Sequence, residues 1–500
     1  VYMAGYIQDK FSFKDLIFNV GVRVDRFDAN QKVMKDLYSL YGTRKVQDVS
    51  SIGGDDVSHP ESIGDDYVVY VDDEVNPTKI TGYRSGDDWF NAEGTFVNNP
   101  NILAEDGFPV PYLSDPLDNN PKDDVKQEGF VDILNTAFED YTPQISVMPR
   151  IAFSFNISDE ATFFANYSVL TQRPQQRNDA YADQYYFFSE LATTGIINNP
   201  NLKPEKTIAY QLGFKQKVSR TSAITISGFY REMRDMIQVI RVPIAYPVPS
   251  YNTLGNIDFG TVKGLEFSYD LRRTGNIQLL ANYTLQFSDG TGSDALGAEN
   301  QVNAGQGNLR TIRPLSFDSR HGINLSIDYR YGGGSKYDGP RIKDLALFAN
   351  TGANLIIRSR SGTPYSRQSI PTPRGQFGVA SRAQLEGQVN GSRLPWNSRV
   401  DLNFDRDITL NPNKEKGKKE YIVNIYLQIQ NVLNTRNLLT AYAATGSGEN
   451  DGYLNSAVGA QDAASQINPE TFALLYGYKI LDPNNFNIPR RIRLGASFSF

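Results

Sequence analysis

Strict alternation of apolar and polar residues is the feature that most limits how this chain can fold. In residues 323–331 the odd positions are Ile, Leu, Ile, Tyr and Tyr, and the even positions are Asn, Ser, Asp and Arg. Residues 18–25, 277–287, 421–429 and 492–500 repeat the pattern. Because successive side chains of a strand point to opposite faces, each segment predicts a strand with one apolar and one polar face.

About thirteen segments of this kind occur along the chain, and many have ten or more residues. Strands of soluble sheets usually have five or six residues, whereas about ten residues suit a tilted strand that crosses a bilayer. The thirteen expected strands lie near residues 2–13, 16–26, 145–157, 161–170, 206–218, 222–233, 262–271, 276–288, 319–331, 344–358, 398–409, 419–432 and 490–500.

The connections between these segments alternate between short and long. The short ones are 14–15, 158–160, 219–221, 272–275, 332–334 and 411–418, and the long ones are 27–144, 171–205, 234–261, 289–318, 359–397 and 433–489. Outer-membrane barrels have short periplasmic turns and long extracellular loops. The pattern therefore predicts an all-β fold, a transmembrane antiparallel β-barrel in the outer membrane of a Gram-negative bacterium. The alternative is a soluble sandwich in which two apolar faces pack together.

The composition excludes several other classes. The chain has no Cys, only two His residues (His59 and His321) and a net charge of −6. A zinc site of His and Cys, a disulfide scaffold and a nucleic-acid binder are therefore not expected. No run approaches 18 consecutive apolar residues, so no transmembrane helix is predicted. Neither His lies in the sequence context of a Ser or Cys nucleophile that it could activate, and we expect no enzyme activity.

The longest connection, 27–144, is strongly acidic. It has 24 Asp plus Glu against 8 Lys plus Arg, whereas the remainder of the chain has 32 against 42. Pairs such as Asp55-Asp56 and Asp72-Asp73 suggest an extracellular loop that attracts cations and binds calcium. None of them follows the pattern of a calcium-binding loop. The other interpretation is a solvated acidic surface, and no cofactor or metal is otherwise expected.

Three of the long connections combine aromatic residues with Arg, a combination that suits sugar, peptide or anionic ligands. The alternative is that these aromatic residues form an interfacial girdle or fold the loops on themselves. The candidate ligand-binding residues are Arg173, Arg177, Tyr181, Tyr185, Tyr186, Tyr246, Tyr251, Arg367, Arg374 and Trp396.

Several short motifs resemble those of TonB-dependent outer-membrane receptors. Residues 199–207 (NPNLKPEKT), followed by YQLGF at 210–214, are the most specific, and GLEF at 264–267, QNVLN at 430–434 and the terminal Phe500 also fit. Within this family the chain is most similar to the Oar-like branch with a carboxypeptidase regulatory domain. The resemblance implies a 22-stranded barrel around a plug domain, with a TonB box that couples it to the inner-membrane complex.

The sequence differs from that pattern in having no plug-like segment, no TonB box and only about thirteen strands. An open sheet would leave unsatisfied backbone groups in hydrocarbon, at a cost of several kcal/mol each. We therefore expect residues 1–500 to be the C-terminal portion of such a barrel, the last thirteen of 22 strands. Residues 27–144 would be a long acidic extracellular insertion within it.

The resemblance implies a receptor that binds a ligand at its extracellular loops and imports it by TonB-coupled transport. Its partners would be outer-membrane lipid and the TonB complex, the latter through an N-terminal segment absent from this sequence. The alternative is a surface receptor that transports nothing, or a partner in an assembly or secretion complex that includes a surface lipoprotein. The residues expected to face the lumen are Asn282, Gln286, Asn324, Asp328, Asn424 and Gln428.

Overall fold

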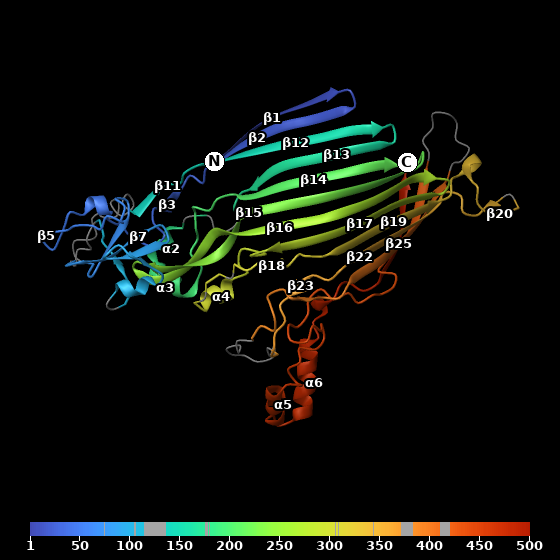
Figure 1. Ribbon diagram of the computed structural model, residues 1–500. Helices are drawn as coiled ribbons and strands as arrows, with labels where there is room; N and C mark the ends of the chain where they lie inside the picture. The colour runs from blue at the N-terminus through green and yellow to red at the C-terminus, as the bar shows by residue number, and fades with distance from the viewer. Residues whose placement is uncertain are drawn as a thin grey trace.

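One large antiparallel sheet dominates the computed structural model. The structure describes residues 1–74, 76–104, 107–114, 137–175, 179, 181–305, 307–308, 310–343, 345–371, 384–410 and 421–500. In Figure 1 the strands lie side by side as a single curved, open layer. In order across the sheet they are β1 (Tyr2–Phe13), β2 (Leu16–Phe27), β12 (Gln144–Ser158), β13 (Ala161–Gln172), β14 (Glu205–Lys217), β15 (Ser222–Ala245), β16 (Val248–Thr274), β17 (Ile277–Gly290), β19 (His321–Arg330), β22 (Thr351–Arg360), β25 (Asn397–Thr409), β26 (Ile422–Gln430) and β27 (Arg491–Ser499).

All thirteen predicted strands are confirmed, and each pairs with the next one along this order. The two-residue β18 (Arg313–Pro314) pairs with β17 outside the main path. Short turns lie at one end of the sheet, except that the connection predicted at 332–334 is wrong and spans residues 331–350. The other long connections gather at the opposite end, which we call the loop end (Figure 1). The sixth short connection, 411–418, lies outside the described residues.

The connection predicted at 234–261 is wrong. Strands β15 and β16 instead continue to Ala245 and Val248, and they stay paired up to a turn at Tyr246-Pro247. Val239 and Leu254 in this extension are fully buried because loops cover both of its faces. Strands buried on both faces have no alternation of apolar and polar residues, so the sequence pattern that identified the other strands is absent here.

The predicted start of a strand at residue 344 is also wrong, because β22 begins at Thr351. The preceding connection contains η3 (Gly334–Lys336) and the short pair β20 (Arg341–Ile342) and β21 (Leu345–Ala346). Lys343 and Asn350 have left-handed backbones with φ of 54° and 53°. This conformation is incompatible with an extended strand and separates the two apolar stretches.

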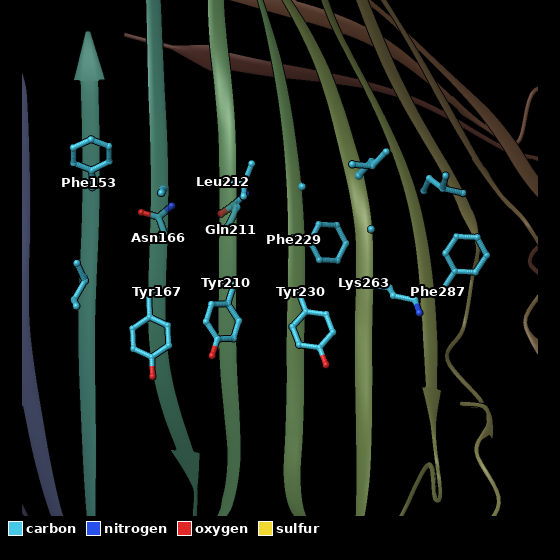
Figure 2. Close-up of a pocket in the computed structure, with 16 residues that line it drawn as sticks. Phe153, Asn166, Tyr167, Tyr210, Gln211, Leu212, Phe229, Tyr230, Lys263 and Phe287 are labelled. Atoms are coloured by element: carbon cyan, nitrogen blue, oxygen red, sulfur yellow. The ribbon is translucent and has the colours of Figure 1, made fainter. Parts of the chain in front are cut away.

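The register places apolar side chains on one face of the sheet and polar side chains on the other. Leu325, for example, lies opposite Ala281 and Ile357, whereas its neighbour Asn324 lies opposite Asn282 and Arg358. The apolar face is bare: Ile7, Leu212 and Leu494 are 72%, 60% and 77% exposed. Figure 2 shows part of this face, with the rings of Tyr167, Tyr210 and Tyr230 on neighbouring strands.

No second layer packs on the apolar face in the described part of the chain. Five of the six buried hydrophobic clusters are formed by loops and by the β15–β16 extension. The sixth is a small group of Met148, Val169 and Ile208 in the sheet itself. A sandwich of two sheets would bury this face against another sheet, so the soluble alternative is wrong.

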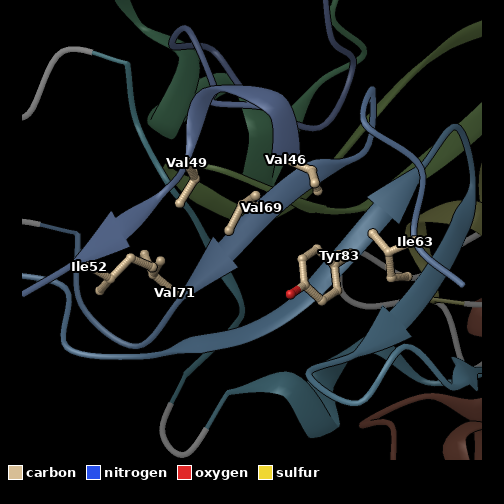
Figure 3. Close-up of a cluster of buried hydrophobic side chains, with 7 residues drawn as sticks. All are labelled: Val46, Val49, Ile52, Ile63, Val69, Val71 and Tyr83. Carbon is tan, nitrogen blue, oxygen red and sulfur yellow. The ribbon is translucent and has the colours of Figure 1, made fainter. Parts of the chain in front are cut away.

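The acidic connection between β2 and β12, which we call the insertion, has a core of its own. Its main sheet has the order β10-β6-β7-β8-β9. Figure 3 shows the cluster beneath it, formed by Val46, Val49, Ile52, Ile63, Val69, Val71 and Tyr83. The elements of the insertion are β3 (Lys32–Met34), η1 (Val46–Asp48), β4 (Ser51–Ile52), β5 (Asp55–Asp56), β6 (Val68–Val71), β7 (Ile80–Ser85), β8 (Asp88–Asn91), β9 (Phe96–Val97), η2 (Pro100–Leu103), β10 (Val110–Pro111) and β11 (Phe138–Asp140).

Short helices complete the loop end. They are α2 (Ala182–Tyr186), α3 (Phe188–Thr194), α4 (Glu299–Asn303), α5 (Ala457–Ala464), α6 (Pro469–Ile480) and η4 (Pro483–Asn485), with the short pair β23 (Pro364–Tyr365) and β24 (Ser392–Arg393). In Figure 1, α5 and α6 form an arm that projects away from the sheet. Among the described residues, no helix has the length and apolar character needed to cross a membrane.

Candidate ligand-binding site

The extension of β15 and β16 is the scaffold of the loop end. Helix α3 packs against it through Phe188 and Ala192, in a cluster that also contains Val242 and Tyr251. Backbone bonds add to this packing, because the Ile197 amide donates to the Asn252 carbonyl over 2.8 Å. The hydroxyl of Thr253 donates in turn to the Ile197 carbonyl over 2.9 Å. The 171–205 connection is therefore fixed to the hairpin.

The insertion is attached to the tip of the same hairpin. The Leu40 amide donates to the Tyr246 carbonyl (2.9 Å), and the Tyr246 amide donates to the Tyr38 carbonyl (3.0 Å). Ile244 packs in a buried cluster with Tyr70 and Trp89 of the insertion. Loops far apart in the sequence are thus joined into one packed unit, rather than extending separately into solvent.

A buried Arg lies at the centre of this contact. Arg84 forms an ion pair with Asp36, and its Nε donates to the Tyr70 hydroxyl over 3.0 Å. Its guanidinium lies 4.5 Å from the centre of the Tyr38 ring. Burial raises the pKa of Tyr70 to about 12, so this hydroxyl stays neutral and can accept the bond from Arg84. Arg84 is thus fully engaged in holding the insertion together.

Two of the predicted ligand residues, Tyr246 and Tyr251, are buried between the loops. Tyr246 is 5% exposed and bonds through its hydroxyl to Glu74, and Tyr251 is 2% exposed. The Tyr251 hydroxyl donates to the Leu37 carbonyl over 2.9 Å. In this structure they fold the loops on themselves, as the alternative interpretation of the sequence had it.

The other aromatic candidates are more accessible. Tyr186 is 82% exposed and Tyr181 is also exposed, whereas Tyr185 is half-buried with its ring 5.0 Å from that of Phe138. Burial raises the pKa of Tyr185 to about 12. Trp396 stacks at 5.7 Å on His321, a residue on the apolar face, which is the arrangement expected of a girdle.

The charged candidates are dispersed. Arg173 lies over the Tyr2 ring at 4.6 Å, and Arg367 pairs with Glu386 at 3.0 Å. Arg177 and Arg374 lie outside the described residues. No hydrogen bond, ion pair or ring contact joins any two of the eight candidates that the structure describes. The ligand role of these residues stays a prediction.

The six residues expected to face the lumen share the polar face of the sheet. Asn282 and Asn324 are direct cross-strand partners, and Asp328 pairs with Arg273. The side-chain amide of Asn424 donates to Asp407 over 2.7 Å. Gln286 and Gln428 have the same parity on their strands. The common face is a property of the structure, and the lumen remains a prediction.

A pocket of about 670 Å³ opens on the polar face at the loop end. We call it the arginine pocket, because Arg358 and Arg360 of β22 and Arg399 of β25 line it. The bases of three long connections complete its wall, and this wall consists of Phe317, Ser319, Ser361, Gly362, Thr363, Leu394, Pro395, Asn397, Leu438, Leu439 and Asn487. No acidic side chain is among the lining residues.

The arginine pocket carries an excess of positive charge. Asp401, buried beside it, accepts bonds from Arg358 (3.1 Å) and Arg399 (3.0 Å), and its other oxygen accepts the Asn431 amide at 2.9 Å. Within the described residues, the side chain of Arg360 has no hydrogen-bond or ion-pair partner. Asp401 thus pairs with two of the three guanidinium groups, and the remaining positive charge suits a carboxylate or phosphate ligand.

Sequence reasoning missed this pocket. The signal was Arg358 and Arg360 two residues apart, which places both on the polar face of one strand. Their proximity to Arg399 depends on the pairing of β22 with β25, where Arg358 and Arg399 are direct partners. That pairing cannot be read from the spacing of residues along the sequence.

No metal centre is evident among the described residues. They contain no group of three or more His, Asp or Glu side chains close enough to share a metal ion. Asp72, one of the paired acidic residues, accepts bonds from the amides of Thr78 (2.8 Å) and Lys79 (3.1 Å) of its own loop. His59 bonds to the Val49 carbonyl at 2.7 Å. Calcium binding by the insertion stays a prediction.

Comparison with known proteins identifies the family. A family model described as TonB-dependent receptor-like β-barrel matches residues 2–432. A search of curated proteins finds no match. Among solved structures, the chain is similar to the FrpB iron transporter from Neisseria meningitidis (12% identity, TM-score 0.41, covering 87% of this chain and 41% of that one).

Two further solved structures match this chain with similar identity and coverage. They are the ferric-catecholate import receptor Fiu from E. coli K12 (13% identity, TM-score 0.42, 88% and 41% covered) and FpvA from P. aeruginosa bound to heterologous pyoverdines (11%, 0.40, 88% and 45%). The chain spans less than half the length of these proteins. The Oar-like branch stays an expectation. With a family match over most of its length, the chain belongs to the TonB-dependent receptors of the Gram-negative outer membrane, as part of their β-barrel.

Proposed function

We propose that the chain is part of a receptor that binds an anionic ligand at its loop end and imports it by TonB-coupled transport. The observation that carries this proposal is the arginine pocket. It lies on the polar face, at the bases of three long connections, and it has more guanidinium groups than carboxylates. A ligand held there would lie between the outer loops and the polar face of the sheet.

The polar face itself supports a water-filled interior. On this face Arg330 and Asp405 form a bidentate ion pair with N–O distances of 2.7 and 2.8 Å, and Arg273 forms an ion pair with Asp328. Ion pairs of this kind are costly in hydrocarbon but are common on the inner wall of an outer-membrane barrel. Family membership also favours a receptor over an enzyme.

A second candidate function rests on the arm formed by α5 and α6. The face of α6 that packs inward contains Tyr476 and Ile480, while Leu474, Leu475 and Tyr478 are exposed on its other side. Exposed apolar side chains grouped on a helix are typical of protein interfaces. They favour a role as a surface receptor or complex partner, such as one that holds a lipoprotein.

Depletion of compounds from the growth medium separates the two functions. Cells with and without the receptor gene are grown in a complex medium, and anionic compounds in the spent medium are quantified by mass spectrometry, with and without a protonophore. Import predicts that one or more anions are depleted only when both the receptor and the proton-motive force are present. Equal depletion in all cultures would contradict import, and co-purification of a stable partner through α6 would then favour the second function.

A further inference from the structure

A groove of about 760 Å³ crosses the apolar face, away from the arginine pocket. Its floor is one cross-strand row that contains Ala165, Leu212, Gly228 and Leu265. The next row toward the loop end contains Tyr167, Tyr210 and Tyr230, and the next row toward the turns contains Phe163, Phe214 and Phe267. Ala165 and Gly228 in the middle row are small, and the rings of Tyr167, Tyr210 and Tyr230 line the groove on its loop-end side.

Gly228 in particular keeps the groove open. A Cβ atom placed on it would have Leu265 as its nearest neighbour, at 3.6 Å, so a larger side chain would point into free space. No second strand or loop occupies that space in the described residues, and the neighbouring Leu212 and Leu265 are exposed. The glycine is therefore not required by close packing within the protein.

The loop end of the groove is polar. Tyr210 and Tyr230 lie 6.2 Å apart, and Figure 2 shows the hydroxyls of Tyr167, Tyr210 and Tyr230 pointing the same way, toward the loop end. Lys263 is the direct cross-strand partner of Tyr230 and is exposed. In the described residues neither its ammonium group nor the three hydroxyls has a hydrogen-bond partner.

An unpaired ammonium group beside hydrocarbon is costly, so it needs an anion or a position at the interface. Two acidic side chains, Glu232 and Asp289, lie one pair closer to the loop end on this face by register. Glu232 is already paired with Arg234 at 2.6 Å, and within the described residues no ion pair joins Asp289 to Lys263. Lys263 is therefore available to an anion from outside the protein.

We propose that the groove binds one membrane lipid, with an acyl chain on the row of Ala165 and Gly228 and a headgroup of net negative charge on Lys263. A lipid fits both parts of the site, because it supplies an apolar chain and an anionic group joined at the boundary where the Tyr hydroxyls lie. The residues involved face the bilayer and play no part in the proposed import.

Native mass spectrometry of the protein purified from outer membranes can test this site. The probes are phosphatidylglycerol, which is anionic, and phosphatidylcholine, which has the same acyl chains and no net charge. Lys263→Gln should weaken phosphatidylglycerol binding about fivefold, the effect of one basic residue at a membrane surface, and should leave phosphatidylcholine binding unchanged. Gly228→Leu should abolish tight binding of both lipids because it fills the groove.

Two matched controls lie on the same sheet. Gly5→Leu adds the same side chain to the apolar face of β1, where a Cβ meets no atom within 4 Å, and Lys215→Gln removes a charge from the polar face. Both should bind lipid like the wild type. Unchanged binding in Lys263→Gln and Gly228→Leu would overturn the proposal. So would an equal loss in the controls, or a Gly228→Leu effect on dimerisation with no effect on lipid.

Discussion

Charged residues on the two faces of the sheet differ in whether they have a partner of opposite charge. On the polar face, Asp401 is shared by Arg358 and Arg399, and Asp405 accepts two bonds from Arg330. On the apolar face, Lys263 has no such partner in the described residues. Charge is therefore tolerated on one face and exceptional on the other, and substitutions should reflect this asymmetry.

Neighbouring positions of β26 offer the simplest comparison. Ile425 is on the apolar face, so Ile425→Arg should destabilise the barrel by about 2–4 kcal/mol, the cost of Arg near the centre of a bilayer. Asn424→Arg places the charge beside Asp407 on the polar face and should cost much less. Urea unfolding in lipid vesicles measures both, and equal losses would show that the faces have been assigned wrongly.

Asp401 is expected to matter more for stability than the Arg residues of the pocket. Asp401→Asn leaves Arg358 and Arg399 without a carboxylate and should cost about 2 kcal/mol, allowing for the partial exposure of both Arg residues. Arg360→Gln removes no internal bond and should change stability by less than about 0.5 kcal/mol. The same unfolding assay compares them, and a larger effect of Arg360→Gln would contradict the pairing described for Asp401.

Among the elements, alternation was sufficient to locate all thirteen strands of the main sheet, because each has one bare apolar face. Alternation did not locate strand segments that are covered on both faces. The β15–β16 extension is covered on both sides, as the burial of Val239 and Val242 shows, so its residues do not alternate. The pattern did not predict the five-stranded sheet of the insertion, because its strands have only two to six residues and are too short to show alternation.

The hairpin extension should control the order of the loop end. Tyr251→Ala removes a buried ring that packs 5.0 Å from Phe188, and it should cost about 3–5 kcal/mol locally. Tyr251→Phe loses only the bond to the Leu37 carbonyl, about 1 kcal/mol. Limited proteolysis should cut residues 171–205 faster in Tyr251→Ala, with the exposed Tyr186→Ala as the control. Equal cutting in all variants would mean that the hairpin does not hold these loops.

The insertion should be sensitive to alkaline pH. Burial raises the pKa of Tyr70 and of Tyr83 to about 12, above the ordinary value of 10, because the folded insertion favours the neutral phenols. The stabilisation that the folded insertion gains by keeping these two phenols neutral is complete below pH 10 and is lost as the pH rises through 12. In a Trp396→Phe background, Trp89 is the only tryptophan. Its near-ultraviolet dichroism should fade between pH 10 and 12, and a constant signal would contradict this assignment.

Across the whole molecule, the ligand site was harder to predict than the fold. Aromatic and Arg content pointed to three loops, but Tyr246 and Tyr251 serve packing there. The arginine pocket combines strands and loop bases that are more than a hundred residues apart, from Phe317 to Asn487. Only the pairing of strands across the sheet brings them together, and one sequence does not contain that information in its local pattern.

The central claim is that hydrocarbon, and no other protein layer, covers the apolar face. The chain has no Cys, so single Cys residues can be introduced at successive positions from Ile422 to Gln430 and spin-labelled in lipid vesicles. Accessibility to oxygen, which dissolves in lipid, and to a water-soluble nickel complex is then measured at each position. We expect oxygen accessibility to peak at residues 423, 425, 427 and 429 and nickel accessibility at the residues between them. Apolar positions accessible to neither reagent, or to nickel, would contradict the account.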